Sequence, residues 1–436
     1  MFIRWLLLIL LVLSSCVKTP QNEKETTLHS VKITEFASDG AWCWFADPRA
    51  VYYEGKHRRT YVGWIDSFSD IRIAYYDHDK GIIFQAPEPL RKSLLNNSGK
   101  PDDHSNPAIL FLPDGRLMVF YSGHNGPSMW YRISKLPENI TEWESEREFE
   151  TNTSGEEGYT YPNPVMLSAE DNRIYLFWRG GNCKPSFSVF DDGLNWSPSK
   201  TLIEGSGRRP YIKFASNGVD EIHFAFTDGH PGREPENNIY YACYRDGAFY
   251  RTDGSLISSL ANLPFAPADA DKVYNAAASG HGRAWIWDIA LDAEDHPVIV
   301  YSAMPEETEH FYCYARWTGS QWQEYQVVSA GGGWFPQTQA GKQESEPHYS
   351  GGIVLDHQNP AVVYLSRKLN GVFEIERWCT PDGGKSWSSS AVTTGSKANN
   401  VRPCVARGHK GETASLFWMQ GNYVHYTEYS TAIMMR

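Results

Sequence analysis

A sevenfold internal repeat constrains the fold of this chain more than any other feature of its sequence. A segment rich in aromatic and β-branched residues, typical of a β-strand, recurs seven times, and successive copies start 48 to 75 residues apart. The seven copies are TYVGWID (60–66), LMVFYSGH (117–124), IYLFWRG (174–180), IHFAFTDG (222–229), PVIVYSAM (297–304), AVVYLSRK (361–368) and TASLFWMQ (413–420).

Each copy stands between two further strand-like segments. The preceding segments are DPRAVYY, NPAILFL, NPVMLSA, RPYIKFA, WIWDIAL, YSGGIVL and RPCVARG, and the following ones are IRIAYYD, MWYRISK, SFSVFDD, NIYYACY, FYCYARW, FEIERWC and YVHYTEY. Tight-turn signals such as Pro113-Asp114-Gly115 join the first two strands of a copy. A glycine-containing turn then leads to an aromatic residue that opens a fourth strand, most clearly in TPDGGKSW (380–387).

Seven units of four strands predict an all-β protein, a single-domain seven-bladed β-propeller over residues 31–436. We expect the segment from Val31 to Phe36 to supply the strand that closes the last blade. A two-domain β-sandwich protein would not explain seven matching triplets. Thr252 to Gly282 form a longer insertion that could wall a groove.

The first thirty residues have the pattern of a secreted lipoprotein. Arg4 precedes an apolar run that ends at Leu13 and is too short to span a membrane, which predicts a signal peptide over residues 1–15. Leu13-Ser14-Ser15-Cys16 resembles a bacterial lipobox, so we expect lipidation at Cys16 and a polar tether over 16–30. The protein would then be anchored by lipid to a bacterial membrane, outside the cytoplasm.

The charge balance excludes a generic nucleic-acid binder. Lys and Arg number 40 against 52 Asp and Glu, a formal net charge of −12, whereas nucleic-acid affinity depends on a basic surface. An anionic ligand would therefore need a local basic patch. We expect a monomer without an organic cofactor.

Propeller topology predicts which polar residues share a face. The start of the first strand and the end of the second strand of every blade lie on the same side of the molecule. This rule places His104, His124, Tyr161 and Arg179 together, with Arg209 and Tyr211 beside them and Arg367 at the end of another second strand.

These residue types suit the β-elimination of a uronic acid. The reaction must neutralise a carboxylate, remove the neighbouring C5 proton and protonate the C4 oxygen that leaves. Arg179, with one histidine, would neutralise the carboxylate, and His104 and Tyr161 would move protons. Each of these residues taken alone could equally have a structural role.

The motifs also resemble a known family. DPRAVYYEGK, DDHSNPAI, DGRLMVFYSGHN, TYPNPVML, IYLFWRGGN, FTDGHP, GRAWIWDIALD and EPHYSGGIVLDHQNP together resemble the BNR-repeat propeller family that includes ulvan lyases, from Ala41 onward. The resemblance implies cleavage of a rhamnose–uronic acid polysaccharide by β-elimination. It also implies a site made of His104, His124, Tyr161 and Arg179, with Tyr159 two residues from the matched tyrosine.

Three other functions compete with the lyase. Related propellers resemble α-L-rhamnosidases whose site lies on the opposite face and depends on a histidine, and His57 is placed on that face. A noncatalytic surface glycan-binding lipoprotein is the second alternative. A sialidase, the third, would need an arginine triad with a Tyr/Glu nucleophile pair, and the RIP-like motif that opens such enzymes is missing from the sequence.

Family members also carry metals, and a structural zinc is a further expectation. His230, Cys243, His310 and Cys313 have the ligand types that zinc takes. Strand alternation places His310 and Cys313 on opposite faces, so a site that uses both would need a bulge. The remaining cysteines are scattered, which predicts buried thiols rather than a disulfide framework.

Overall fold

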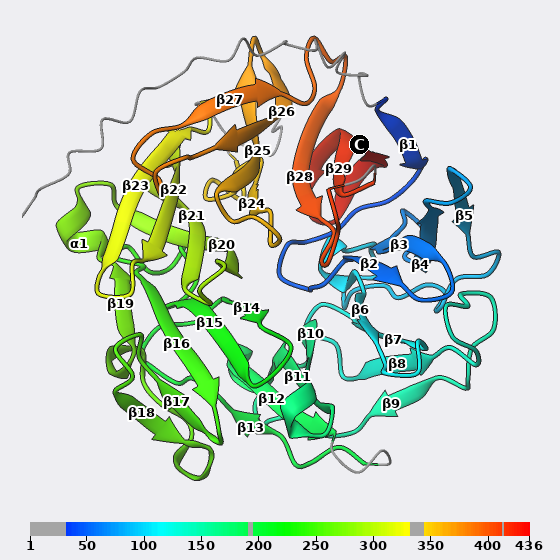
Figure 1. The fold of residues 1–436 in the computed structure, drawn as a ribbon, viewed down its shortest axis with the longest axis horizontal. Coiled ribbons are helices and arrows are strands. Elements are labelled where there is room, and N and C mark those ends of the chain that lie inside the picture. Colours follow the sequence, from blue (N-terminus) through cyan, green and yellow to red (C-terminus); the bar gives the residue numbers. More distant parts are fainter. Residues whose placement is uncertain (1–31, 191–194, 332–343, 412–413) are drawn as a thin grey trace, which may run out of the picture. The chain divides into compact units, whose positions relative to one another are not determined.

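The strands of the unit Ile33–Arg436 form seven antiparallel sheets that follow one another around a common centre, as Figure 1 shows. The structure is a computed structural model and describes residues 32–190, 195–331, 344–411 and 414–436. The seven-bladed β-propeller is thereby confirmed. The signal peptide, the tether and the lipidation at Cys16 lie outside the described residues.

The strands of the first three sheets are β2 (Ala50–Glu54), β3 (Arg58–Ile65), β4 (Ile71–Asp77), β5 (Ile82–Gln85); β6 (Ala108–Phe111), β7 (Leu117–Ser122), β8 (Met129–Ile133), β9 (Arg147–Phe149); and β10 (Thr160–Leu167), β11 (Arg173–Arg179), β12 (Pro185–Phe190), β13 (Lys200–Thr201). The fourth sheet contains β14 (Ile212–Ser216), β15 (Glu221–Thr227), β16 (Ile239–Arg245), β17 (Ala248–Tyr250), β18 (Leu256–Ser259) and β19 (Asp271–Tyr274).

The last three sheets contain β20 (Arg283–Leu291), β21 (Pro297–Glu306), β22 (Glu309–Trp317), β23 (Trp322–Ser329); β24 (Ile353–Leu355), β25 (Val362–Leu369), β26 (Val372–Cys379), β27 (Ser388–Ala391); and β28 (Asn399–Val405), β29 (Leu416–His425), β30 (Glu428–Met435), β1 (Thr34–Ala37). The described helices are short: the 3-10 turns Asp103–Ser105, Ser168–Glu170, Gly181–Cys183, Leu260–Asn262 and Pro267–Asp269, and α1 (Ala276–Ser279).

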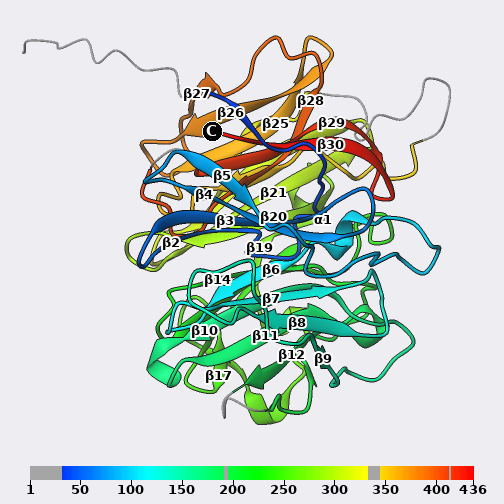
Figure 2. The ribbon, with the colours of Figure 1, turned by 90° about the vertical axis from the view of Figure 1, so that its right-hand side faces the viewer.

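The N-terminal strand closes the ring, as the sequence predicts. β1 pairs with β30 at the outer edge of the seventh sheet, and the two lie side by side in Figure 1 and Figure 2. Phe36 is buried and its ring meets Phe417 of β29 at 5.3 Å between centroids. The first and last strands of the described chain are therefore held in one sheet.

Two predicted segments differ from the structure. β29 continues to His425, so YVHYTEY is not a separate third strand but spans the turn between β29 and β30. The alternating pattern continues through both hairpin arms, which hides the position of the turn. The insertion Thr252–Gly282 differs from a plain loop in that β18 and β19 within it join the fourth sheet.

A buried aromatic segment fills the centre of the ring. Trp44 stacks on Trp287 of β20 with ring centroids 4.1 Å apart, and Phe45 packs on Tyr211 at 4.5 Å. Both side chains precede β2 and contact residues from other sheets. They form the floor on which the candidate site described below rests.

The cysteine prediction agrees with the structure. The six described cysteines form no disulfide, and only Cys379 is not fully buried. Within the described part of the chain, no helix has the length and apolar character needed to cross a bilayer.

Candidate active site

The structure brings together the four side chains that strand topology places on one face. His104 lies in the 3-10 turn ahead of β6, His124 follows β7, Tyr161 lies in β10, and Arg179 ends β11. The rings of His104 and His124 stack with centroids 4.1 Å apart, and the Tyr161 ring lies 5.4 Å from His104. The Cζ atom of Arg179 lies 4.7 Å from the centre of the Tyr161 ring.

A buried carboxylate, Asp102, connects the two histidines. Its Oδ1 lies 2.8 Å from Nδ1 of His104, and its Oδ2 lies 2.9 Å from Nδ1 of His124. The same carboxylate accepts the backbone N–H of His104 and so caps the 3-10 turn. Asp103 also lies 2.9 Å from His104 Nδ1 and is itself held by Arg402 at 3.0 Å. The local fold therefore fixes both imidazole rings.

This arrangement gives the two histidines different charges. Burial opposes protonation of His104, but the adjacent Asp102 carboxylate outweighs it and raises the pKa of His104 to about 10. Burial, followed by the charge of His104, lowers the pKa of His124 to about 4. At neutral pH His104 is a cation and His124 is neutral. Because ionised Asp102 can only accept, His124 donates from Nδ1 and keeps the lone pair on Nε2.

Tyr161 has a buried hydroxyl group with no hydrogen-bond partner among the described residues. A β-bulge between Thr160 and Asn163 shifts the register of β10 against β11 at this point, and Tyr161 has a φ of +61°. Such a conformation is uncommon for a bulky side chain, and residues held in strained conformations cluster at active sites. Burial raises the pKa of Tyr161 well above its usual value, so the phenol is protonated. Tyr159 instead donates to the carbonyl of Phe149.

Arg179 is a buried cation without a carboxylate partner in the described part of the chain. Its side chain is 4% exposed, and its nitrogens donate to Asn125 at 2.9 Å, to Tyr211 at 3.2 Å and to Thr160 at 3.3 Å. Buried charges in proteins are normally paired. The guanidinium group is therefore poised for an anionic partner from outside the chain.

The three residues predicted to bind substrate lie in different surroundings. Tyr211 joins the cluster through its hydrogen bond with Arg179. Arg209 lies two residues earlier and pairs with Glu157 at 2.9 Å. Arg367 pairs with Glu376 of β26 at 2.6 Å, and no contact between Arg367 and the histidines is found among the described residues. The structure therefore places Tyr211 in the cluster but does not place Arg367 there.

Sequence reasoning missed two members of the cluster. Asp102 carried a usable signal, since a carboxylate two positions before a candidate catalytic histidine commonly orients it. Tyr426, whose ring lies 4.7 Å from His104 and 5.6 Å from His124, carried none, because it was assigned to a strand and lies in the turn after β29.

A second cluster of titratable side chains lies next to the first one. Glu346 lies 2.9 Å from His348 and 3.7 Å from His425, and the His230 ring meets His348 at 4.4 Å between centroids. The rings of His425 and Tyr426 are in tilted contact, with centroids 3.8 Å apart, and this contact joins the two clusters.

His230 belongs to this second group as a neutral donor. Burial and the neighbouring His348 lower the pKa of His230 to about 2. Gly232 donates its N–H to His230 Nδ1, so the ring proton is on Nε2. That nitrogen is a hydrogen-bond donor rather than a metal ligand in this tautomer.

The four predicted zinc ligands do not form one site. His230 lies with Glu346 and His348, Cys243 lies with Glu221 and His223, and His310 bonds Ser350. Neither His310 nor Cys313 belongs to a group of potential metal ligands in the described residues. The prediction of a joint site is wrong because strand pairing separates these residues: Cys243 lies directly opposite His223 in the β15–β16 ladder.

The Glu221–His223–Cys243 group does fit zinc. His223 Nε2 lies 3.3 Å from Glu221 and 4.0 Å from the Cys243 sulfur, close to the ligand separations of a tetrahedral ion. Tyr241 lies 2.6 Å from the other ring nitrogen and orients the imidazole.

Curated relatives and solved structures are similar to this chain over most of its length. An "Ulvan lyase" of Nonlabens ulvanivorans is 23% identical over 400 residues, which cover 79% of this chain and 76% of the relative. An "Ulvan Lyase-PL25" of Pseudoalteromonas sp. (strain PLSV) is 23% identical over 366 residues, covering 70% and 71%.

A solved structure has the same fold. It is a PL25 ulvan lyase bound to -[GlcA(1-4)Rha3S]-, with a TM-score of 0.70 at 18% identity, and the match covers 93% of this chain and 95% of that one. The sequence profile of the BNR repeat-containing family matches residues 59–330, so this chain belongs to that family.

Proposed function

We propose that this protein is a polysaccharide lyase that cleaves a rhamnose–uronic acid polysaccharide of the ulvan type by β-elimination. The observation that carries the proposal is the cluster around Arg179, which is buried and has no carboxylate partner among the described residues. Beside it lie one cationic histidine, one neutral histidine and a buried phenol. The substrate class rests on the relatives, whose names describe them as ulvan lyases.

Each residue has a role that follows from its charge. Arg179 and the His104 cation bind the uronate carboxylate. Neutralising its charge lowers the pKa of the C5 proton, so that this proton is removed more easily. Neutral His124 accepts the C5 proton on Nε2. The electron pair of the C5–H bond forms the C4=C5 double bond, the C4–O4 bond breaks, and the phenol of Tyr161 gives its proton to O4.

This assignment revises one sequence-based role. The sequence predicts that His104 moves a proton, whereas in this proposal its pKa of about 10 keeps it protonated at neutral pH, so it is not the base. His104 is instead the histidine that helps to neutralise the carboxylate.

The first test measures the ultraviolet absorbance of the new C4=C5 bond when the protein is mixed with ulvan. We expect a rise with the native chain and a loss of at least about a hundredfold in rate for Tyr161→Phe. Because the Tyr161 hydroxyl has no partner, Tyr161→Phe should leave the melting temperature unchanged or raise it.

The control for this test is His281→Ala, which changes an exposed histidine outside the cluster and should retain full activity. An active Tyr161→Phe protein would contradict the role of the phenol. Free rhamnose without absorbance would indicate the α-L-rhamnosidase, and retention of ulvan without products would indicate a glycan-binding lipoprotein.

We further propose a lipid anchor at Cys16 and a structural zinc ion at Glu221, His223 and Cys243. The lipobox-like sequence before Cys16 supports the anchor, and labelling with a radioactive fatty acid, compared with Cys16→Ser, tests it. When bound, zinc would cross-link β15 and β16 and stabilise the fold, without a part in the elimination.

A further inference from the structure

A cavity of about 540 Å³ lies at the end of the first two blades that faces away from the candidate active site. Its lining includes Lys56 and His57 from the β2–β3 turn and residues 136–141 from the loop between β8 and β9. The β2–β3 turn follows an inner strand, whereas His104 precedes one, so the two sites lie at opposite ends of the blades. This volume is within the range of small-ligand sites in proteins.

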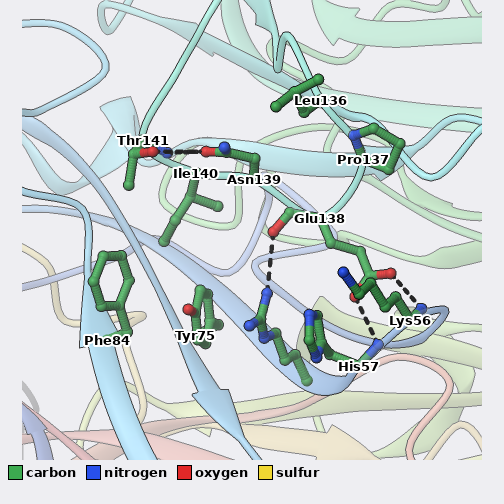
Figure 3. Close-up of a pocket in the computed structure, with 11 residues that line it drawn as sticks. Lys56, His57, Tyr75, Phe84, Leu136, Pro137, Glu138, Asn139, Ile140 and Thr141 are labelled. Carbon is green, nitrogen blue, oxygen red and sulfur yellow. Dashed lines mark hydrogen bonds between the residues drawn. The ribbon is translucent and has the colours of Figure 1, made fainter.

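One side of the cavity is apolar. The rings of Tyr75 and Phe84 stack with centroids 5.2 Å apart and line the cavity together with Leu136, which is 53% exposed. Figure 3 shows Tyr75 and Phe84 on one side of the pocket and Lys56 and His57 on the other. Aromatic faces of this kind pack against the C–H faces of sugar rings.

The other side holds two cations, Lys56 and Arg59. Its one carboxylate, Glu138, accepts the backbone N–H groups of Lys56 and His57, and the latter bond measures 3.0 Å. Arg59 is held by Asp77 at 3.1 Å and stacks over Tyr75 at 4.1 Å. The Lys56 ammonium group has no ion pair among the described residues. Glu138 is engaged by backbone amides and Arg59 by Asp77, so the Lys56 ammonium group is the cation of this lining that remains for an anionic ligand.

The lining does not support cleavage by a pair of carboxyl groups at this site. A hydrolase of the usual kind needs two carboxyl groups on either side of the bond, and the described lining holds only Glu138, whose two oxygens are occupied by backbone amides. An aromatic wall beside a free ammonium group is suited to hold a sugar with an acidic substituent. The described lining thus offers groups that bind a sugar, and His57 is its one residue on which the α-L-rhamnosidase alternative depends.

We propose that this cavity is a second, noncatalytic binding site for a uronate- or sulfate-bearing segment of the polysaccharide that the opposite face cleaves. The identity of the ligand rests on the proposed function. A polymer that spans both sites would dissociate more slowly than one held at the catalytic face alone.

The test uses the full protein with His124→Ala, which prevents turnover, and measures its retardation in gels that contain ulvan. The test variant is Lys56→Ala with Leu136→Ala. The matched control is Lys385→Ala with Leu256→Ala, which removes the same two residue types from exposed positions outside the cavity. The two variants have identical composition and charge, so a general electrostatic effect cancels. Lys56→Glu, with Lys385→Glu as its control, is a second pair that leaves the apolar wall intact.

We expect the cavity variants to bind ulvan about fivefold more weakly, and the controls to bind like the parent. In the active enzyme, KM should rise for the polymer but not for a tetrasaccharide, and kcat should stay unchanged. Equal binding by cavity and control variants, or no retention of the parent, would overturn the proposal.

The experiments distinguish failure of the lyase proposal from failure of the second-site proposal. If the native chain produces no absorbance but the cavity variants still lose retention, only the lyase proposal fails. If absorbance appears and the cavity variants bind like their controls, only the second site fails.

Discussion

At the scale of single residues, Asp102 sets the pH range that the proposed reaction should have. The proposed elimination needs neutral His124, whose pKa is lowered to about 4, and cationic His104, whose pKa is raised to about 10. We therefore expect kcat/KM to fall below about pH 4, as His124 becomes protonated, and above about pH 10, as His104 loses its charge. Asp102→Asn should bring the two limbs toward the ordinary histidine value near 6.5. A native profile with a limb near 6.5 would contradict the assigned charges.

At the scale of elements, the β15–β16 ladder sets the zinc prediction, because it places His223 opposite Cys243. We expect one zinc per chain by metal analysis, and a melting temperature that falls by several degrees when a chelator removes it. Cys243→Ser should lower the zinc content and abolish the response to the chelator. Cys379→Ser, at a partly exposed cysteine elsewhere, should change neither. A native protein that contains no zinc after expression with the metal would refute this site.

At the scale of the whole molecule, the pairing of β1 with β30 holds the two ends of the ring together. A chain that begins at Ser38 lacks β1, loses the buried Phe36 and exposes an edge of β30. We expect it to melt several degrees below a chain that begins at Lys32 and to associate through the free edge, as judged by size-exclusion chromatography. Equal melting temperatures would show that closure by β1 contributes little to stability.

The sequence by itself determined the number of blades, the strands of six of them, the closing strand and the face shared by His104, His124, Tyr161 and Arg179. These features follow from local signals, since strand periodicity and turn residues depend on near neighbours along the chain. They also follow from propeller topology, which relates equivalent positions in successive blades.

Only the tertiary structure decided the charge states of the two histidines and the contact partners of the site residues. His104 is protonated and His124 is neutral because Asp102 is buried between them. Whether Arg179 has a carboxylate partner depends on which side chains the other blades bring near it. Tyr426 enters the site because β29 runs longer than its pattern indicates. Cys243 meets His223 rather than His310 because strand register, which is a nonlocal property, selects its neighbours.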